Sequence, residues 1–212
     1  MERGLTQARR SLVVVALIAV LVAVPSTAMA QTAGDRRVVI VLGAGDDAPT
    51  AIAQEAIGFW NQVLTELELG TRLVGTTLVA TPRSARILEN YTRQVWQQAG
   101  RLTPGGPGPK EPRRLGDLGA DVVVFLSGQP TMSFAWPLRQ SAGFFVAVPA
   151  ETVTRNILAH ELGHALGLTH HDNPMVLMCS PCQEAQMIDD GPFLPLTPHD
   201  RSRLRELHAS AP

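Results

Sequence analysis

The sequence predicts a mixed α/β layer that is followed by a C-terminal part rich in loops. Three observations support this fold class. Short β-branched runs alternate with amphipathic helical segments over most of the chain, which is typical of strands packed under helices. Of the 212 residues, 45% are hydrophobic and 17% are charged, so the chain can bury a core. Beyond Gly167 the periodic pattern stops until close to the C-terminus.

The first predicted element is a strand at 38–42, a continuous run of β-branched and aliphatic residues. A helix is expected from Pro49 onward, because apolar residues recur at helical spacing until Gly70 ends the segment. A weakly alternating strand at 73–80 comes next. It is followed by a helix at 85–99, which carries its aliphatic and aromatic side chains on one side.

Segment 101–114 interrupts this order, because it contains four Pro and three Gly. We expect an exposed loop there, since proline removes backbone donors and breaks helices and ladders. Two compact apolar runs at 121–126 and 143–148 then predict buried strands. Pro149 ends the second of them, and a helix is expected to begin at Thr152.

The first thirty residues have the features of a signal peptide. Three Arg precede an uninterrupted apolar run at 12–24, and a small-residue cleavage pattern ends at Ala30. The alternative is a membrane anchor, but thirteen residues in a helix span only about 20 Å of a hydrocarbon core of roughly 30 Å. We therefore expect cleavage of 1–30 and a mature protein, 31–212, that is secreted or extracytoplasmic and has no stable membrane anchor.

The charge balance of 18 Lys and Arg against 19 Asp and Glu lacks the basic excess with which proteins bind nucleic acid. Nucleic acid is therefore excluded as an expected partner, and the sequence carries no signal of oligomeric state. The two cysteines, Cys179 and Cys182, lie close together. In an exported chain such a pair favours a disulfide, while a redox motif or half of a zinc site are the alternatives.

The segment from His160 to His170 carries the strongest functional signal. His160 and His164 are one helical turn apart, so both imidazoles point the same way and can bind one zinc ion. Glu161 projects beside such a metal and is placed to act as a base. Gly167 permits the sharp turn that ends the helix and brings His170 round as a third ligand, which leaves the fourth position for water.

This H-E-x-x-H-x-x-G-x-x-H pattern resembles the signature of the metzincin zinc endopeptidases, in which a methionine-containing turn follows the motif. The chain is most similar to the matrixin branch, because Met178 stands where matrixins have the Met-turn. Met175 is the alternative for this position. Residues 196–207 resemble the C-terminal helix of matrixins. His171 is a departure, since matrixins usually have Ser directly after the third ligand.

The resemblance implies an α+β, metzincin-like zincin fold. Such a fold has a mixed twisted sheet with helices in an N-terminal subdomain, a zinc-binding active-site helix, a Met-turn and a C-terminal helix. On this interpretation residues 31–212 form a single metallopeptidase catalytic domain. Its N-terminal subdomain, 31–167, includes the active-site helix, and its C-terminal subdomain, 168–212, includes the Met-turn.

The resemblance also implies a zinc-dependent endopeptidase, a hydrolase that cuts peptide or protein substrates, and the signal peptide predicts that it is secreted. Zinc would activate a water molecule, and Glu161 would be the general base. In metzincins the substrate lies extended against an edge strand, and the order of the elements places 142–148 at that edge. The residues expected to bind substrate are Ala142, Gly143, Phe144 and Phe145.

Three further interpretations stay open at this point. The acidic pairs Asp46-Asp47 and Asp189-Asp190 offer oxygen ligands of the kind that calcium prefers, although such pairs in turns are usually only solvated. A secreted binding module could keep zinc solely to stabilise its fold. A zinc amidase acting on a small or cell-wall substrate would use the same water chemistry.

Overall fold

The computed structural model describes residues 34–43, 48–99, 108–140, 143–182 and 191–209. The predicted signal peptide, both acidic pairs proposed for calcium, and Ala142 lie outside the described residues. Within the described part of the chain, no helix is both long enough and apolar enough to span a bilayer.

A five-stranded mixed sheet forms the centre of the molecule, in the order β2-β1-β3-β5-β4. Four strands run parallel, and the short β4 pairs antiparallel with β5 at one edge. The strands are β1 (Asp35–Leu42), β2 (Arg72–Val79), β3 (Val122–Ser127), β4 (Phe134–Pro137) and β5 (Phe144–Pro149). The inner strands are nearly continuous apolar runs because helices cover both of their faces.

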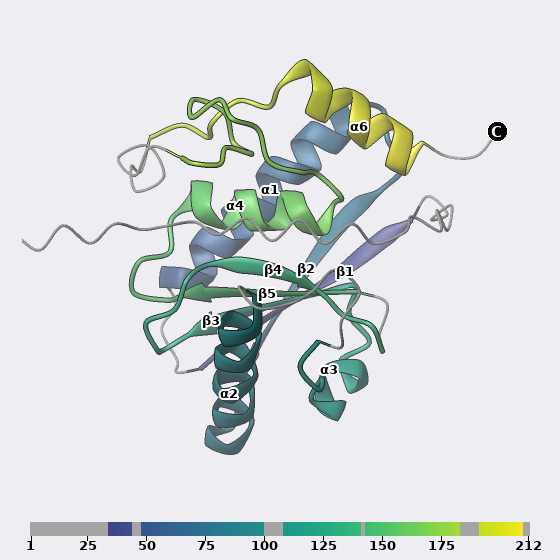
Figure 1. The fold of residues 1–212 in the computed structure, drawn as a ribbon. Coiled ribbons are helices and arrows are strands. Elements are labelled where there is room, and N and C mark those ends of the chain that lie inside the picture. Colours follow the sequence, from purple (N-terminus) through teal and green to yellow (C-terminus); the bar gives the residue numbers. More distant parts are fainter. Residues whose placement is uncertain (1–33, 44–47, 100–107, 141–142, 183–190, 210–212) are drawn as a thin grey trace, which may run out of the picture.

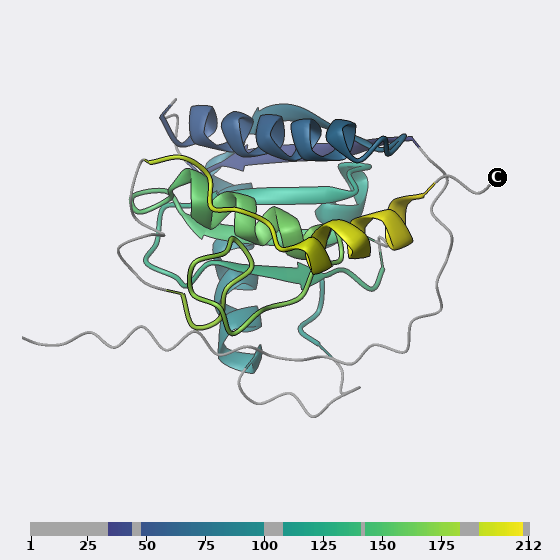
Figure 2. The ribbon, with the colours of Figure 1, turned by 90° about the horizontal axis from the view of Figure 1, so that it is seen from above.

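Helices cover the two faces of this sheet, as Figure 1 shows. On the upper face of that view, α1 (Ala48–Glu66) and α4 (Arg155–Ala165) pack on the sheet over one hydrophobic core. On the lower face, α2 (Pro82–Ala99) and the short α3 (Arg113–Asp117) pack over a second core. Viewed from above in Figure 2, α1, α4 and the C-terminal helix lie on the same side of the sheet.

The chain beyond α4 is mostly irregular until α6 (Pro198–His208) begins. Thr197 caps α6 in a capping box with Asp200, in which each side chain accepts a hydrogen bond from the backbone of the other. Leu204 of α6 is fully buried in the upper core, and His208 Nε2 donates to the carbonyl oxygen of Leu166, 2.9 Å away. The last helix is thereby attached to the end of α4.

The predicted order of elements is confirmed, with two additions. The sequence interpretation missed α3, which begins inside the segment expected to be a loop, and it missed β4. Both are very short, and β4 ends at Pro137. Four-residue strands carry too few positions for an alternating pattern to be recognised.

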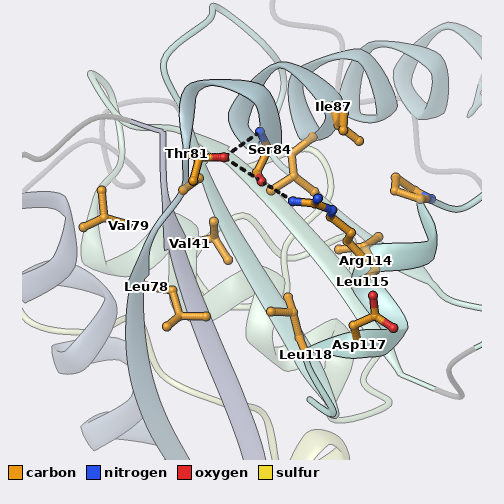
Figure 3. Close-up of a pocket in the computed structure, with 13 residues that line it drawn as sticks. Val41, Leu78, Val79, Thr81, Ser84, Ile87, Arg114, Leu115, Asp117 and Leu118 are labelled. Carbon is orange, nitrogen blue, oxygen red and sulfur yellow. Dashed lines mark hydrogen bonds between the residues drawn. The ribbon is translucent and has the colours of Figure 1, made fainter.

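The lower face also has an open cavity of about 470 Å³ between the end of β2 and helices α2 and α3 (Figure 3). Leu78, Leu115 and Leu118 line it, together with the polar side chains of Ser84 and Arg114 at its rim. It lies on the side of the sheet away from α4. Helix α4, which carries the first two predicted zinc ligands, lies on the opposite, upper face (Figure 1).

Candidate metal centre

Helix α4 carries the first two predicted ligands and the predicted base. Thr154 is its N-cap, and its side chain accepts a hydrogen bond from the backbone N–H of Ile157 at 3.2 Å. This start differs from the expected Thr152 by a few residues. His160 and Glu161 are 2% and 4% exposed, so the helix presents both side chains to the interior.

The helix ends where the motif requires a turn. Gly167 has φ +93°, a conformation that residues with a side chain rarely adopt. The backbone N–H of Leu168 donates back to the carbonyl oxygen of Gly163 at 3.0 Å, which closes the last turn in the manner of a Schellman cap. The chain then reverses and brings His170 to the side of α4 that carries His160 and His164.

The three histidines converge on one point. Their Nε2 atoms lie 3.1 Å apart for His160 and His164, 3.1 Å for His160 and His170, and 3.0 Å for His164 and His170. Nitrogen ligands at 2.0 to 2.1 Å from a tetrahedral zinc ion stand roughly 3.4 Å from one another. The spacing of the three nitrogens therefore fits a shared zinc ion.

The hydrogen bonds of the Nδ1 atoms show which ring nitrogens of His160 and His164 carry a lone pair. Nδ1 of His160 lies 2.6 Å from the carbonyl oxygen of Leu177, and Nδ1 of His164 lies 3.0 Å from that of Leu168. A carbonyl only accepts, so both Nδ1 atoms must carry the proton. Each neutral ring then turns an unprotonated Nε2 toward the other two. Lone pairs facing one another at 3 Å are the arrangement that a shared cation stabilises, so the donor set fits zinc.

Burial keeps these rings neutral. It lowers the pKa of His160 to about 3 and that of His170 to about 4, and it also lowers the pKa of His164. The neighbouring histidines add to the lowering for His160 and His170. Because only neutral imidazole binds a metal, the site is prepared for zinc well into mild acid.

Glu161 follows the first of these histidines, His160, in α4 and does not belong to the histidine cluster. Burial raises the pKa of its carboxyl to about 8, and a hydrogen bond with the backbone of Ala135 in β4 partly opposes this rise. A buried carboxyl with a raised pKa is suited to exchange protons near neutral pH. This hydrogen bond also shows that the edge strand β4 lies next to Glu161.

Met178 lies beneath α4. It is fully buried, and a Cβ atom placed on Gly163 would approach its Sδ to 2.5 Å. The same Cβ would lie 3.0 Å from Cζ2 of Trp60. Only glycine therefore leaves room for this methionine under the helix. Met175, the alternative for the Met-turn, is 51% exposed and lies at the surface.

Cys179 and Cys182 form the predicted disulfide directly after Met178. Their sulfurs lie near His160, within 4.8 Å of one of its ring nitrogens. Because both sulfurs are engaged in the bond, this second cluster offers no thiolate to a metal. The expected alternative of half a zinc site does not describe the oxidised protein.

The edge position predicted for segment 142–148 is wrong for its described residues, 143–148. β5 is flanked by β3 on one side and by β4 on the other, so both of its backbone edges are paired. Phe145 is fully buried, and its ring packs against Tyr91 of α2 on the lower face. Phe144 is the first residue of this interior strand, and Gly143 directly precedes it. The missed strand β4 occupies the edge instead, which removes the reason for assigning substrate binding to these residues.

The sequence interpretation missed the role of two residues near the site, His171 and Asp200. His171 was noted only as a departure from the usual residue, yet its Nε2 lies 2.7 Å from Oδ1 of Asp200. Asp200 is 1% exposed. The Thr197-x-x-Asp200 spacing is a capping-box pattern and was the available signal for this carboxylate.

Comparison with known proteins agrees with this geometry. The model of the matrixin family of peptidases matches residues 89–209, more than half of the chain. The crystal structure of metalloproteinase-II from Bacteroides fragilis is 14% identical with a TM-score of 0.50, and the match covers 82% of this chain and 53% of that one. This similarity concerns the fold.

A chain from the structure of a chaperone–substrate complex is 16% identical, with a TM-score of 0.44, over 66% of this chain and 25% of that one. The present chain thus spans between about a quarter (25%) and about half (53%) of the length of these two solved chains. No curated protein matches the sequence significantly.

Proposed function

This chain belongs to the matrixin family of zinc metallopeptidases, and we propose that it is an exported zinc endopeptidase that uses Glu161 as its general base. The observation that carries the proposal is the convergence of three Nε2 atoms within 3.1 Å of one another, in a motif that also supplies the buried carboxyl of Glu161. His160, His164 and His170 would hold the zinc ion. When bound, the ion supplies Lewis acidity and lowers the pKa of a water molecule.

Glu161 supplies the proton transfer in this proposal. Its carboxyl is held in place by burial in α4 and by the backbone of Ala135. From there it accepts a proton from the attacking water and returns it to the leaving amine, which is the role of a general base followed by a general acid. A purely structural metal site has no use for a base at this position.

The substrate would lie along β4. This strand is the sheet edge on the α4 side, and its residues Phe134–Pro137 are only partly buried. An extended peptide that pairs with the edge of β4 facing away from β5 gains main-chain hydrogen bonds, which bind many sequences with modest preference. The hydrogen bond between Ala135 and Glu161 supports this proposal, because it brings β4 next to the carboxyl that would act as the base.

Export is part of the proposal. A disulfide between Cys179 and Cys182 is stable in oxidising compartments and rare in reducing ones. The predicted signal peptide at 1–30 is consistent with that location.

The test is cleavage of heat-denatured casein by the purified protein, with bound zinc measured in parallel. We expect about one zinc ion per chain and an activity that falls roughly a thousandfold in Glu161→Gln while zinc stays bound. Glu151→Gln is the matched control, because this exposed glutamate precedes α4 and should leave activity unchanged.

Other outcomes have distinct meanings. Full zinc occupancy without cleavage of any protein substrate by the wild type would contradict the endopeptidase and favour a zinc-stabilised binding module. Turnover of small amides alone would favour an amidase. Absence of bound zinc would refute the ligand assignment.

A further inference from the structure

His171 occupies a junction between the metal centre and the C-terminal helix. It follows the third ligand, His170, directly in sequence. Its backbone forms an isolated β-bridge with Cys179: the N–H of His171 donates to the carbonyl oxygen of Met178, and its carbonyl oxygen accepts from the N–H of Ser180, both at 2.7 Å. The residue is therefore extended and is paired with the segment that contains the buried methionine.

The same segment also orients the first ligand. Leu177, one residue before Met178, accepts the hydrogen bond from Nδ1 of His160 at 2.6 Å. Two of the three histidines thus depend on segment 177–180, one through its side chain and the other through its chain neighbour. A shift of this segment would move both Nε2 atoms relative to that of His164.

The side chain of His171 attaches this junction to α6. Its Nε2 donates to Oδ1 of Asp200 at 2.7 Å, and the Asp200 side chain is 1% exposed. The other carboxylate oxygen, Oδ2, is already used by the cap of the helix, since it accepts from the backbone N–H and the hydroxyl of Thr197 at 2.9 and 2.8 Å. Asp200 is fixed by the capping box, and His171 is fixed to Asp200.

We infer that His171 is a positioning residue for the zinc ligand His170. Successive side chains of an extended segment point to opposite sides. Holding the ring of His171 against Asp200 on one side therefore sets the direction of the His170 ring on the other. Metal affinity depends on such outer contacts, whose removal typically weakens binding 10- to 100-fold. The inference rests on the proposed zinc site.

The test compares two substitutions of His171 in the full chain. His171→Phe fills the space of the ring but cannot donate to Asp200, whereas the amide of His171→Gln restores a donor at a similar reach. We expect zinc binding, measured by competition with a chromophoric chelator, to weaken about tenfold in the Phe variant and less than threefold in the Gln variant. The visible spectrum of bound Co²⁺ should shift in the Phe variant only, and kcat should fall while KM stays unchanged.

His199→Ala is the matched control, because this exposed residue lies on α6 with its ring centroid 5.7 Å from that of His171. It should retain the zinc affinity and the Co²⁺ spectrum of the wild type. Should His171→Phe fail to fold, His171→Ala is measured by the same criteria.

An unchanged zinc affinity and Co²⁺ spectrum in a folded variant that lacks the donor would overturn the inference, and the contact with Asp200 would then serve only to anchor α6. A wild type that binds no zinc would instead refute the proposed function. The two failures are distinguishable because the first requires a normal zinc site in the wild type.

Discussion

The two faces of the sheet are covered by helices, yet they are packed differently. On the upper face, Trp60 of α1 donates from Nε1 to the carbonyl oxygen of Ala159 at 2.9 Å, and Gly163 leaves no space for a side chain. On the lower face, α2 and α3 leave a cavity of about 470 Å³ (Figure 3). Leu78 and Val79 at its margin are 43% and 66% exposed.

The difference follows from what each face must hold. Three nitrogens about 3 Å apart need a close-packed support, because a displacement of half an ångström already changes metal geometry. The lower helices need only to cover apolar strands, which tolerates gaps and solvent-exposed contacts. We therefore expect equivalent changes on the two faces to have unequal effects, and three predictions follow from this contrast, in order of size.

The largest effect should come from the carboxyl buried on the upper face. In metal-free protein the pKa of Glu161 is raised to about 8, so the folded state binds more protons than the unfolded state between pH 4.5 and 8. The contribution of Glu161 to the free energy of unfolding must then fall as pH rises through this window. Glu161→Gln removes that fall, so its advantage over wild type should grow by about 4 kcal/mol from pH 4.5 to pH 8.

Urea unfolding of both metal-free proteins at several pH values measures this difference. Below pH 6.5 both proteins should lose stability on acidification, because burial lowers the pKa of His160 and His170 in the folded state. That loss is common to the two proteins and cancels in the comparison. A constant difference across the whole range would show that the carboxyl is not buried.

The second prediction applies one substitution to both faces. Gly163→Ala should destabilise the protein by about 2 kcal/mol, because its Cβ would overlap the buried Met178 and the ring of Trp60. Gly116→Ala in α3 has no atom within 4 Å of its new Cβ. It should stabilise by about 0.5 kcal/mol, since alanine restricts the unfolded chain. Equal effects in denaturant unfolding would contradict the contrast between the faces.

The sequence predicted the metal centre better than its surroundings, for a physical reason. The three predicted ligands and Glu161 lie within eleven consecutive residues, so helix geometry and one glycine turn determine their arrangement. The structure brings His160, His164 and His170 together as expected. The same local logic predicted the disulfide, whose two cysteines are three residues apart.

The features that the sequence could not reveal depend on contacts between distant segments. The edge of the sheet is set by where β4 pairs, and a four-residue strand gives no periodic signal. His171 and Asp200 are 29 residues apart, and no local rule joins them. Charged or polar partners brought together by tertiary packing become visible only in the folded chain.

The third prediction has the smallest effect and compares two single hydrogen bonds. Arg114 donates to Oγ of Ser84 at 3.1 Å on the exposed rim of the lower cavity, as Figure 3 shows. His171 donates to a carboxylate that is almost fully buried. When an exposed hydrogen bond is lost, water readily replaces the missing partner. A buried acceptor that loses its donor stays unsatisfied, and this lowers the free energy of unfolding.

Arg114→Ala should therefore change the free energy of unfolding by less than about 0.5 kcal/mol and leave zinc affinity at the wild-type value. Thermal unfolding and chelator competition on the same preparation measure both quantities. A loss of zinc affinity in this variant would mean that the lower face is coupled to the metal centre through the sheet. The two faces could then no longer be treated as independent, because the metal centre on the upper face would depend on contacts made by the lower helices.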